Sequence, residues 1–267
     1  MNLFFHKYSI NLCQFKNLRT LRILNLSLSD IPFIQSSIVH LIHLVNFRLS
    51  IDSNDINPTS VIHINDNFLL GSHLKHVKLN LFVRTIFNQL NRNSSIEQLA
   101  ITWCQLQELI HLLQYTPRLH TLKASLNGFI PDDFWSEKLA GKFPLRLNSL
   151  KLVIESISFD DLYLFLREFP QLRSLWLLLN HSEYLNVDKW QNLLEFYLTN
   201  LDQLDLTIAL MKPISFTFTS PFLAYEQFNK SFWFNKGWQA KLNEYDRCIR
   251  LIVSNNLMPM IKKIRKE

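Results

Sequence analysis

Glycine is scarce in this sequence: the 267 residues contain only four, against 21 phenylalanines. Tight β-hairpins use glycine to reach positive φ angles, so the shortage disfavours a sandwich of many hairpin-linked strands. The four glycines also stand singly, which disfavours a glycine-rich loop that cradles phosphate groups. The sequence therefore predicts neither a hairpin-rich β-sandwich nor a nucleotide-binding loop.

Cysteine is equally sparse, with Cys13, Cys104 and Cys248 far apart and odd in number. This disfavours a disulfide framework and favours a reducing compartment, so we expect the cytoplasm or the nucleus. The first ten residues, MNLFFHKYSI, lack the basic start and cleavage site of a secretory signal. No apolar run approaches the ~18 residues that would span a bilayer, so we expect no membrane partner.

A strong excess of one charge is also missing. The formal net charge is +6, and the terminal segment KKIRKE carries half of it. With 48% hydrophobic and 19% charged residues, the chain has the composition of a globular protein with a large core. The nearly balanced charge of the rest disfavours a general affinity for nucleic acid.

The sequence does contain a repeated pattern: a leucine-like residue, two others, a second leucine-like residue, then apolar residues at alternate places. Eight copies occur: LRILNLSL from Leu21, LVNFRLSI from Leu44, LKHVKLNL from Leu74, IEQLAITW from Ile96, LHTLKASL from Leu119, LNSLKLVI from Leu147, LRSLWLLL from Leu172 and LDQLDLTI from Leu201. Their second leucine-like residues are 24, 47, 77, 99, 122, 150, 175 and 204, which are 22 to 30 residues apart. A period of this size indicates a solenoid.

Each copy reads as a short strand followed by a helix. Alternation puts Leu150, Leu152 and Ile154 on the core face of one strand. Helical spacing of apolar residues predicts helices over 106–115, 159–169 and 187–198, with Ser158 and Asp161 forming an N-terminal cap. Because strand and crossover helix repeat in the right-handed sense, we predict an α/β solenoid whose parallel strands line a concave face, with irregular helices on the convex face.

These copies resemble the leucine-rich repeat family over residues 18 to 212, in the irregular style found attached to F-box segments. The last position of the family pattern is filled as expected by Cys104, Asn127 and Asn180, but the other copies depart from it, with Ser29, Asp52, Phe82, Glu155 and Ala209. The resemblance implies a horseshoe and a role as substrate receptor among ubiquitin-ligase components. About 17 residues precede the first repeat, so we expect the F-box itself to be absent.

The repeat pattern predicts a solenoid over residues 1–212 and a C-terminal capping segment with a basic tail over 213–267. This segment is rich in aromatic residues, and we expect its rings to cover the core of the last repeat; an aromatic groove for a peptide or single-stranded nucleic acid is the alternative. Phe216 and Phe218 alternate as in a strand, and CIRLIVS from Cys248 predicts another.

Residues between the core positions should form columns on the concave face. The first column is Asn25, Arg48, Lys78, Ala100, Lys123, Lys151, Trp176 and Asp205; the second is Ser27, Ser50, Asn80, Thr102, Ser125, Val153, Leu178 and Thr207. We predict that a partner binds at seven of these: Arg48, Lys78, Lys123, Lys151, Val153, Trp176 and Leu178. Two alternatives remain open: the C-terminal segment covers Trp176, or the cations are simply solvated.

Catalytic patterns find little support. His40 and His43, like His73 and His76, lack the cysteine or carboxylate partners of a metal site, so we expect neither metal nor cofactor. Asp132–Asp133 and Asp160–Asp161 stand where helices begin and favour complementing helix N-termini, and Cys104 favours inert packing. The leading hypothesis is a non-catalytic scaffold for a protein partner, with an acidic partner suited to the cations. The alternative is a nucleic-acid binder that uses the basic column and the tail.

Overall fold

The computed structural model describes residues 12–51, 61–64, 73–81, 84–87, 94–128, 135, 143–144, 146–211, 219–245 and 248–255. The chain divides into two compact units, residues 1–150 and 151–267. Each unit is α/β, and parallel strand pairs predominate in the chain as predicted. No helix among the described residues is long and apolar enough to cross a membrane.

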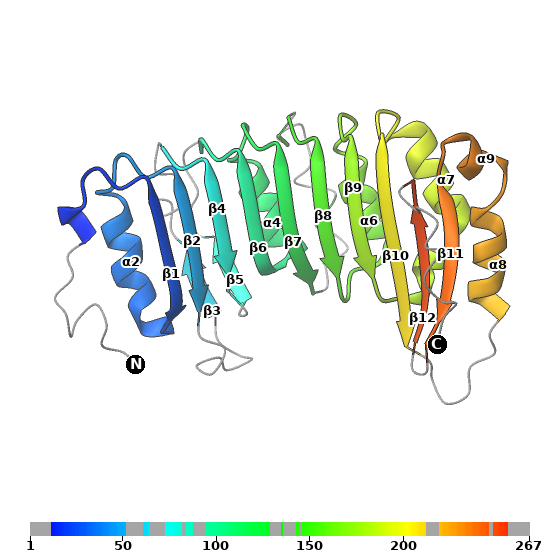
Figure 1. The fold of residues 1–267 in the computed structure, drawn as a ribbon, viewed down its shortest axis with the longest axis horizontal. Coiled ribbons are helices and arrows are strands. Elements are labelled where there is room, and N and C mark those ends of the chain that lie inside the picture. Colours follow the sequence, from blue (N-terminus) through cyan, green and yellow to red (C-terminus); the bar gives the residue numbers. More distant parts are fainter. Residues whose placement is uncertain are drawn as a thin grey trace, which may run out of the picture. The chain divides into compact units, whose positions relative to one another are not determined.

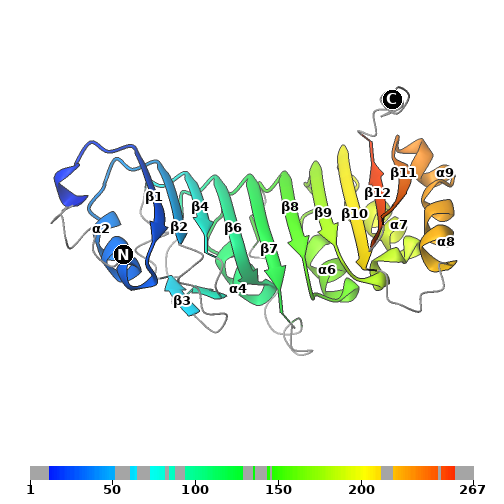
Figure 2. The same cartoon turned by 60° about the horizontal axis from the view of Figure 1, so that its bottom comes forward.

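The first unit is built on parallel strands that follow one another in sequence order. Its strands are β1 (Thr20–Leu26), β2 (Asn46–Ile51), β4 (His76–Asn80), β6 (Gln98–Gln105) and β7 (Thr121–Asn127), with the first residues of β8 (Ser149–Ile154) following β7. Its helices are η1 (Leu12–Gln14), η2 (Leu28–Asp30), α2 (Ile31–Ile38) and α4 (Leu106–Leu113). A separate parallel pair joins β3 (Val61–Ile64) to β5 (Arg84–Phe87). Figures 1 and 2 show α4 against one face of β6 and β7.

The predicted core column is confirmed from β2 to β7. Phe47, Val77, Leu99 and Leu122 occupy one register position on adjacent strands, and all four are buried. Leu49, Leu79 and Ile101 form the next buried row. Because alternate side chains of a strand point to opposite faces, the residues between these rows form the other face of the sheet.

The prediction for the first strand was wrong. Leu24 does not join the core column: its side chain is 59% exposed, and Leu21 is the residue that pairs with Phe47. The register shifts between Ile23 and Leu26, and Asn25 there has a φ of 54°, so the strand carries a bulge. Ile23 and Leu26 are buried on either side of it, which turns Leu24 outward.

A second irregularity lies in β6, between Ile101 and Cys104. Cys104 pairs with Leu126, and it is Gln105 that pairs with Asn127. Cys104 and Asn127 therefore do not share a register position, contrary to their alignment at the last place of the repeat. Thr102 lies within this irregular stretch, and its hydroxyl donates to the Leu79 carbonyl at 3.1 Å.

The second unit continues with the rest of β8 and then β9 (Ser174–Leu179), β10 (Gln203–Met211), β12 (Cys248–Ser254) and β11 (Gln239–Glu244). β9 and β10 pair in parallel, with Leu175 opposite Leu204, whereas β12 and β11 are antiparallel. The strand predicted from Cys248 is thus confirmed. The helices are α6 (Phe159–Leu166), η4 (Ser182–Leu185), α7 (Val187–Phe196), α8 (Thr219–Phe228) and α9 (Ser231–Asn235). Figure 1 shows α8 and α9 beside β11 and β12.

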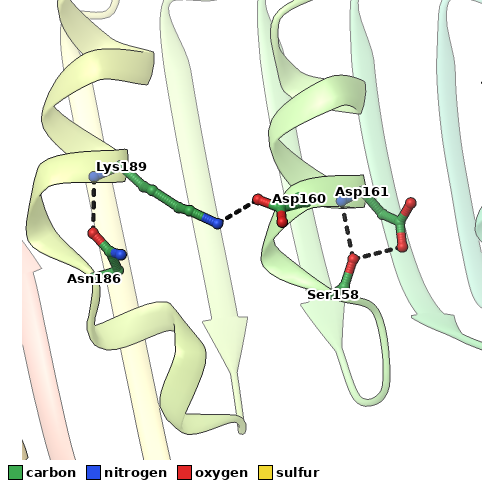
Figure 3. Close-up of polar contacts among 5 residues, drawn as sticks. All are labelled: Ser158, Asp160, Asp161, Asn186 and Lys189. Carbon is green, nitrogen blue, oxygen red and sulfur yellow. Dashed lines mark hydrogen bonds and ion pairs between the residues drawn. The ribbon is translucent and has the colours of Figure 1, made fainter.

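The predicted helices form, somewhat shorter than their patterns, and Figure 3 shows the caps of α6 and α7. Ser158 Oγ accepts from the Asp161 amide at 3.1 Å and donates to the Asp161 carboxylate at 2.6 Å. Asn186 caps α7 by accepting from the Lys189 amide at 3.1 Å. The Lys189 ammonium also pairs with Asp160 of α6, joining the two helices. Asp132 and Asp133 lie outside the described residues.

Aromatic rings of the C-terminal segment pack mainly on one another. Phe228 and Trp233 lie 4.7 Å apart between ring centroids, Trp233 and Trp238 lie 5.9 Å apart, and all three are buried. These three rings form a buried cluster, whereas Phe222, Phe234 and Tyr245 of the described segment are exposed. Phe216 and Phe218, for which a strand was predicted, and the basic tail lie outside the described residues.

Candidate partner-binding surfaces

Strand register in the first unit brings four cations into one row. Arg22, Arg48, Lys78, Ala100 and Lys123 stand opposite one another on β1, β2, β4, β6 and β7, on the pleat facing away from the buried leucines. We call these five residues the basic row. Arg22 takes the place that the sequence assigned to Asn25, because the bulge in β1 moves the register. Ser27 likewise leaves its predicted column: it follows β1 and is buried.

The basic row lines a hollow of about 550 Å³. Two residues earlier on each strand, and so on the same face, a polar row adds side chains that can donate or accept: Thr20, Asn46, His76, Gln98 and Thr121. Asn46 Nδ2 donates to Thr20 Oγ1 at 3.2 Å, so neighbouring members of this row hold each other in place. No carboxylate is among the residues that line the hollow.

The cations of the basic row have no ionic partner within the described part of the chain, where the ion pairs involve other residues: Lys75–Glu97, Arg167–Glu168, His181–Glu183 and Lys189–Asp160. Adjacent strands lie about 4.8 Å apart, so Arg22, Arg48 and Lys78 place three like charges within about 10 Å. Such an arrangement raises the free energy of the unbound protein and is relieved by an anion.

The second unit holds a different cluster around Trp176. Lys151 Nζ lies 3.7 Å from the centroid of the Trp176 ring, and the Trp176 side chain hydrogen-bonds Asp205, its register partner on β10. We call Lys151, Trp176 and Asp205 the tryptophan row. The cation–π contact fixes the ring beside the ammonium, because an ammonium is attracted to the face of an indole.

An apolar strip runs next to the tryptophan row. Leu178 stands opposite Thr207, which stands opposite Ile252 of β12, and Val153 lies on the same pleat of β8 as Lys151. These side chains are half-buried. The C-terminal strand β12 pairs with the edge of β10, so it lies beside the tryptophan row and not over it. The structure thus brings Lys151, Val153, Trp176 and Leu178 together as predicted from the alternation.

Burial raises the pKa of Asp205, against the lowering effects of Lys151 and of the Trp176 hydrogen bond. A carboxyl whose folded pKa lies above its unfolded value loses stability as the pH rises through that raised value. Asp205→Asn, which can still accept from Trp176, should therefore raise the urea midpoint at pH 7. The gain should shrink towards about pH 3, where the wild-type carboxyl is mostly protonated in both states. Exposed Asp202→Asn is the control, and a gain that grows in acid would contradict this sign.

Cys104 and the histidine pairs are the other residues that the sequence offers for reactive or metal-binding chemistry. Cys104 is buried, and burial raises the pKa of its thiol far above the ordinary value, so the reactive thiolate is disfavoured. His76 lies in the polar row, while His73 lies in the turn before β4. Among the described residues, no three histidine, cysteine or acidic side chains gather closely enough to hold a metal ion.

Sequence reasoning missed three members of these surfaces: Arg22, Asp205 as a partner of Trp176, and Ile252. Arg22 could have been found by allowing a bulge at the adjacent apolar pair Ile23–Leu24. The other two depend on which strands become neighbours. A comparison of the chain with protein-family models and with curated proteins found no match.

Proposed function

We propose that this chain is a leucine-rich repeat scaffold without catalytic activity, and that the basic row of its first unit binds an acidic segment of a partner protein. The observation that carries this proposal is the row itself: four cations in register, without an ionic partner among the described residues, that line a hollow with no carboxylate in its described lining. A charged row of this kind favours binding over folding stability, since like charges opposite each other on a sheet are destabilising.

The dimensions suit an extended segment that crosses the strands. From Arg22 to Lys123 there are four strand-to-strand steps, or about 19 Å. An extended peptide covers this distance with about six residues. Carboxylates at alternate places would then meet the cations, while the polar row can donate to the peptide backbone. A protein partner ranks before nucleic acid because the net charge outside the C-terminal tail is small.

The tryptophan row and its apolar strip supply a second contact of another kind. We propose that a large apolar side chain of the partner packs on Trp176, Leu178 and Val153 in the second unit. Aromatic residues next to cations are common energetic centres of protein interfaces. Lys151 and Lys241, which stands opposite Ile252 on β11, would face acidic residues that flank the apolar one.

The first test removes cations from the basic row. Arg48→Ala and Lys78→Ala should each weaken binding of a fluorescein-labelled peptide of alternating glutamate and serine by about tenfold, because each loses a charge-assisted hydrogen bond. Fluorescence anisotropy gives the affinities. Arg118→Ala removes an exposed cation outside the hollow and should have little effect. An equal loss in all three variants would contradict a role for the row.

A nucleic-acid ligand is the alternative that the same row favours. Titration with single-stranded RNA and duplex DNA at about 50 and about 200 mM salt separates the two, since affinity for a phosphate backbone falls steeply with salt. Nucleic acid that binds more tightly than the acidic peptide at both salt concentrations would replace the proposed partner.

The second test addresses the apolar contact. Trp176→Ala combined with Lys151→Ala should weaken an acidic peptide that contains phenylalanine by about thirtyfold, because truncating a central interface tryptophan costs about 2 kcal/mol or more. A phenylalanine-free peptide should be much less affected. Phe196→Ala, which removes an exposed ring from α7, is the matched control. The urea midpoint of the double variant should stay near the wild-type value. A loss of peptide affinity that comes with a lower urea midpoint would contradict the assignment of Trp176 to the binding surface.

The resemblance to F-box-linked repeats adds a narrower proposal: the partner bound here is a ubiquitin-ligase substrate. Co-purification of a ligase adaptor with the tagged full chain from native extract would support this role. If no adaptor co-purifies but the acidic peptide still binds, the ubiquitin-ligase role is contradicted and the scaffold function stands.

A further inference from the structure

We propose that the acidic segment carries a phosphate monoester on a serine or threonine, and that Arg22, Arg48 and Lys78 bind this phosphate. The inference rests on the proposed function, because it assumes that the basic row receives an acidic segment. It goes further by assigning one part of the row to one chemical group.

The cations of the row are not evenly spaced. Arg22, Arg48 and Lys78 occupy three consecutive strands, and Ala100 then separates them from Lys123. Three charges within about 10 Å exceed what one carboxylate neutralises. A phosphate monoester brings about −1.5 to −2 charges and three acceptor oxygens to a single point, which suits three cations on neighbouring strands. Lys123, two strand steps beyond Lys78, is placed for a carboxylate farther along the segment.

The identity of the cations also favours phosphate. Two of the three are arginines, whose planar fork of N–H groups matches a phosphate with two parallel hydrogen bonds. Arg48 is half-buried, and its Nε is enclosed without a hydrogen-bond partner in the described part of the chain. An enclosed Nε means that the arginine stem is packed, so less side-chain freedom is lost when a ligand binds.

Nearby groups complete the phosphate surroundings. Asn46 and Thr20 stand two residues before Arg48 and Arg22 on the same strands, hence on the same face of the sheet, and both line the hollow. Their mutual hydrogen bond leaves the second amide hydrogen of Asn46 as a further donor. His76 lines the hollow on the strand that carries Lys78. All these groups can donate to a phosphate oxygen, and none is an acid that would repel it.

The test compares two synthetic peptides of the same acidic sequence, one with phosphoserine at its centre and one with serine. Fluorescence anisotropy with the full chain should give at least about tenfold tighter binding of the phosphopeptide, as expected for one to three added charge-assisted hydrogen bonds. A third peptide with aspartate at that place should bind like the serine peptide, because one carboxylate does not replace the dianion.

Variants that keep the positive charge of the row test which of its residues bind the phosphate. Arg22→Lys and Arg48→Lys retain the cations but lose the arginine fork, so they should reduce the preference for phosphoserine while changing serine-peptide affinity little. Lys123→Ala should weaken both peptides by a similar factor and leave the preference intact. Circular dichroism at matched urea concentrations shows whether each variant is folded, as expected for substitutions at exposed or half-exposed positions.

Two results would overturn the inference while leaving the proposed function in place: equal affinity for the phosphoserine and serine peptides, or a preference that survives both arginine-to-lysine changes. Inorganic phosphate that competes as well as the phosphopeptide would also overturn it, because the site would then recognise the free ion. If neither peptide binds, the proposed function fails, and the inference fails with it.

Discussion

Replacement of Leu152 by aspartate should unfold the second unit at neutral pH. Leu152 is fully buried on β8, between the buried residues Leu150 and Ile154 of the same strand face. A carboxylate there would lose its water and gain no cation, a cost of several kcal/mol. This is comparable with the whole unfolding free energy of a typical domain, about 5 to 15 kcal/mol. Hydrogen exchange read by mass spectrometry should therefore show lost protection in peptides from residues 151–211.

The adjacent residue provides the control. Val153 points to the other face of the same strand and is half-buried, so Val153→Asp keeps the carboxylate in contact with water. Its urea midpoint should stay close to that of the wild type. Acid should also restore part of the structure of Leu152→Asp, because burial raises the pKa of a carboxyl and protonation removes the charge. Equal midpoints for the two aspartate variants would mean that Leu152 is not a core residue.

Trp190→Ala should produce the next largest loss, about 3 to 5 kcal/mol of unfolding free energy. Trp190 is fully buried on α7, its ring centroid lies 4.9 Å from that of Phe159, and its Nε1 donates to the Tyr184 carbonyl at 2.8 Å. The tyrosine is held in turn by a hydrogen bond from its hydroxyl to the Ile157 carbonyl. Truncation to alanine would leave a cavity among α6, η4 and α7 and an unpaired carbonyl.

Graded variants separate the two contributions of Trp190. Trp190→Phe keeps a ring against Phe159 but loses the indole donor, so we expect a smaller loss that includes about 1 kcal/mol for the hydrogen bond. Asn192→Ala, at an exposed position of the same helix, should change little. Urea unfolding followed by circular dichroism gives the free energies. A loss below about 1 kcal/mol for Trp190→Ala would contradict the packing described here.

Strands and helices of the second unit were the most predictable part of the fold. In LNSLKLVI and LRSLWLLL a leucine or isoleucine stands at every second place from Leu150 and from Leu175, so the repeat template selects the register that buries these residues. The helix 159–166 was equally clear, because Ser158 marks its start and its apolar residues recur at helical spacing. Local chemistry determines these elements, and tertiary packing only selects their neighbours.

β1 shows where the pattern was ambiguous. In LRILNL, Leu21, Ile23, Leu24 and Leu26 are all apolar, and an unbroken strand cannot bury both Ile23 and Leu24 on one face. Matching the repeat template selected Leu24, whereas the protein bulges at Asn25 and buries Ile23 and Leu26. The energetic difference between these registers depends on Phe47 and Ile51 of the neighbouring strand, which no local pattern contains.

The candidate sites were predictable to a similar extent. Arg48, Lys78 and Lys123 were placed correctly because their strands are regular, and Arg22 was missed because its strand is not. The cation–π contact of Lys151 with Trp176 follows from two adjacent strands, but the bond to Asp205 also needs the side-chain geometry. The helix α2 and the pair β3–β5 were overlooked, although the Asp30-Ile31-Pro32 start of α2 is a recognisable signal.

β12 pairs antiparallel with β10, and this pairing determines where a further strand–helix repeat could be added to the protein. Hydrogen bonds are evenly spaced along a parallel pair but alternate between narrow and wide along an antiparallel one. A duplicated strand–helix module inserted between β9 and β10 would find a parallel template on both sides, whereas one attached to β11 would find a mismatched template. Additional repeats should therefore be inserted between parallel strands and not attached at β11.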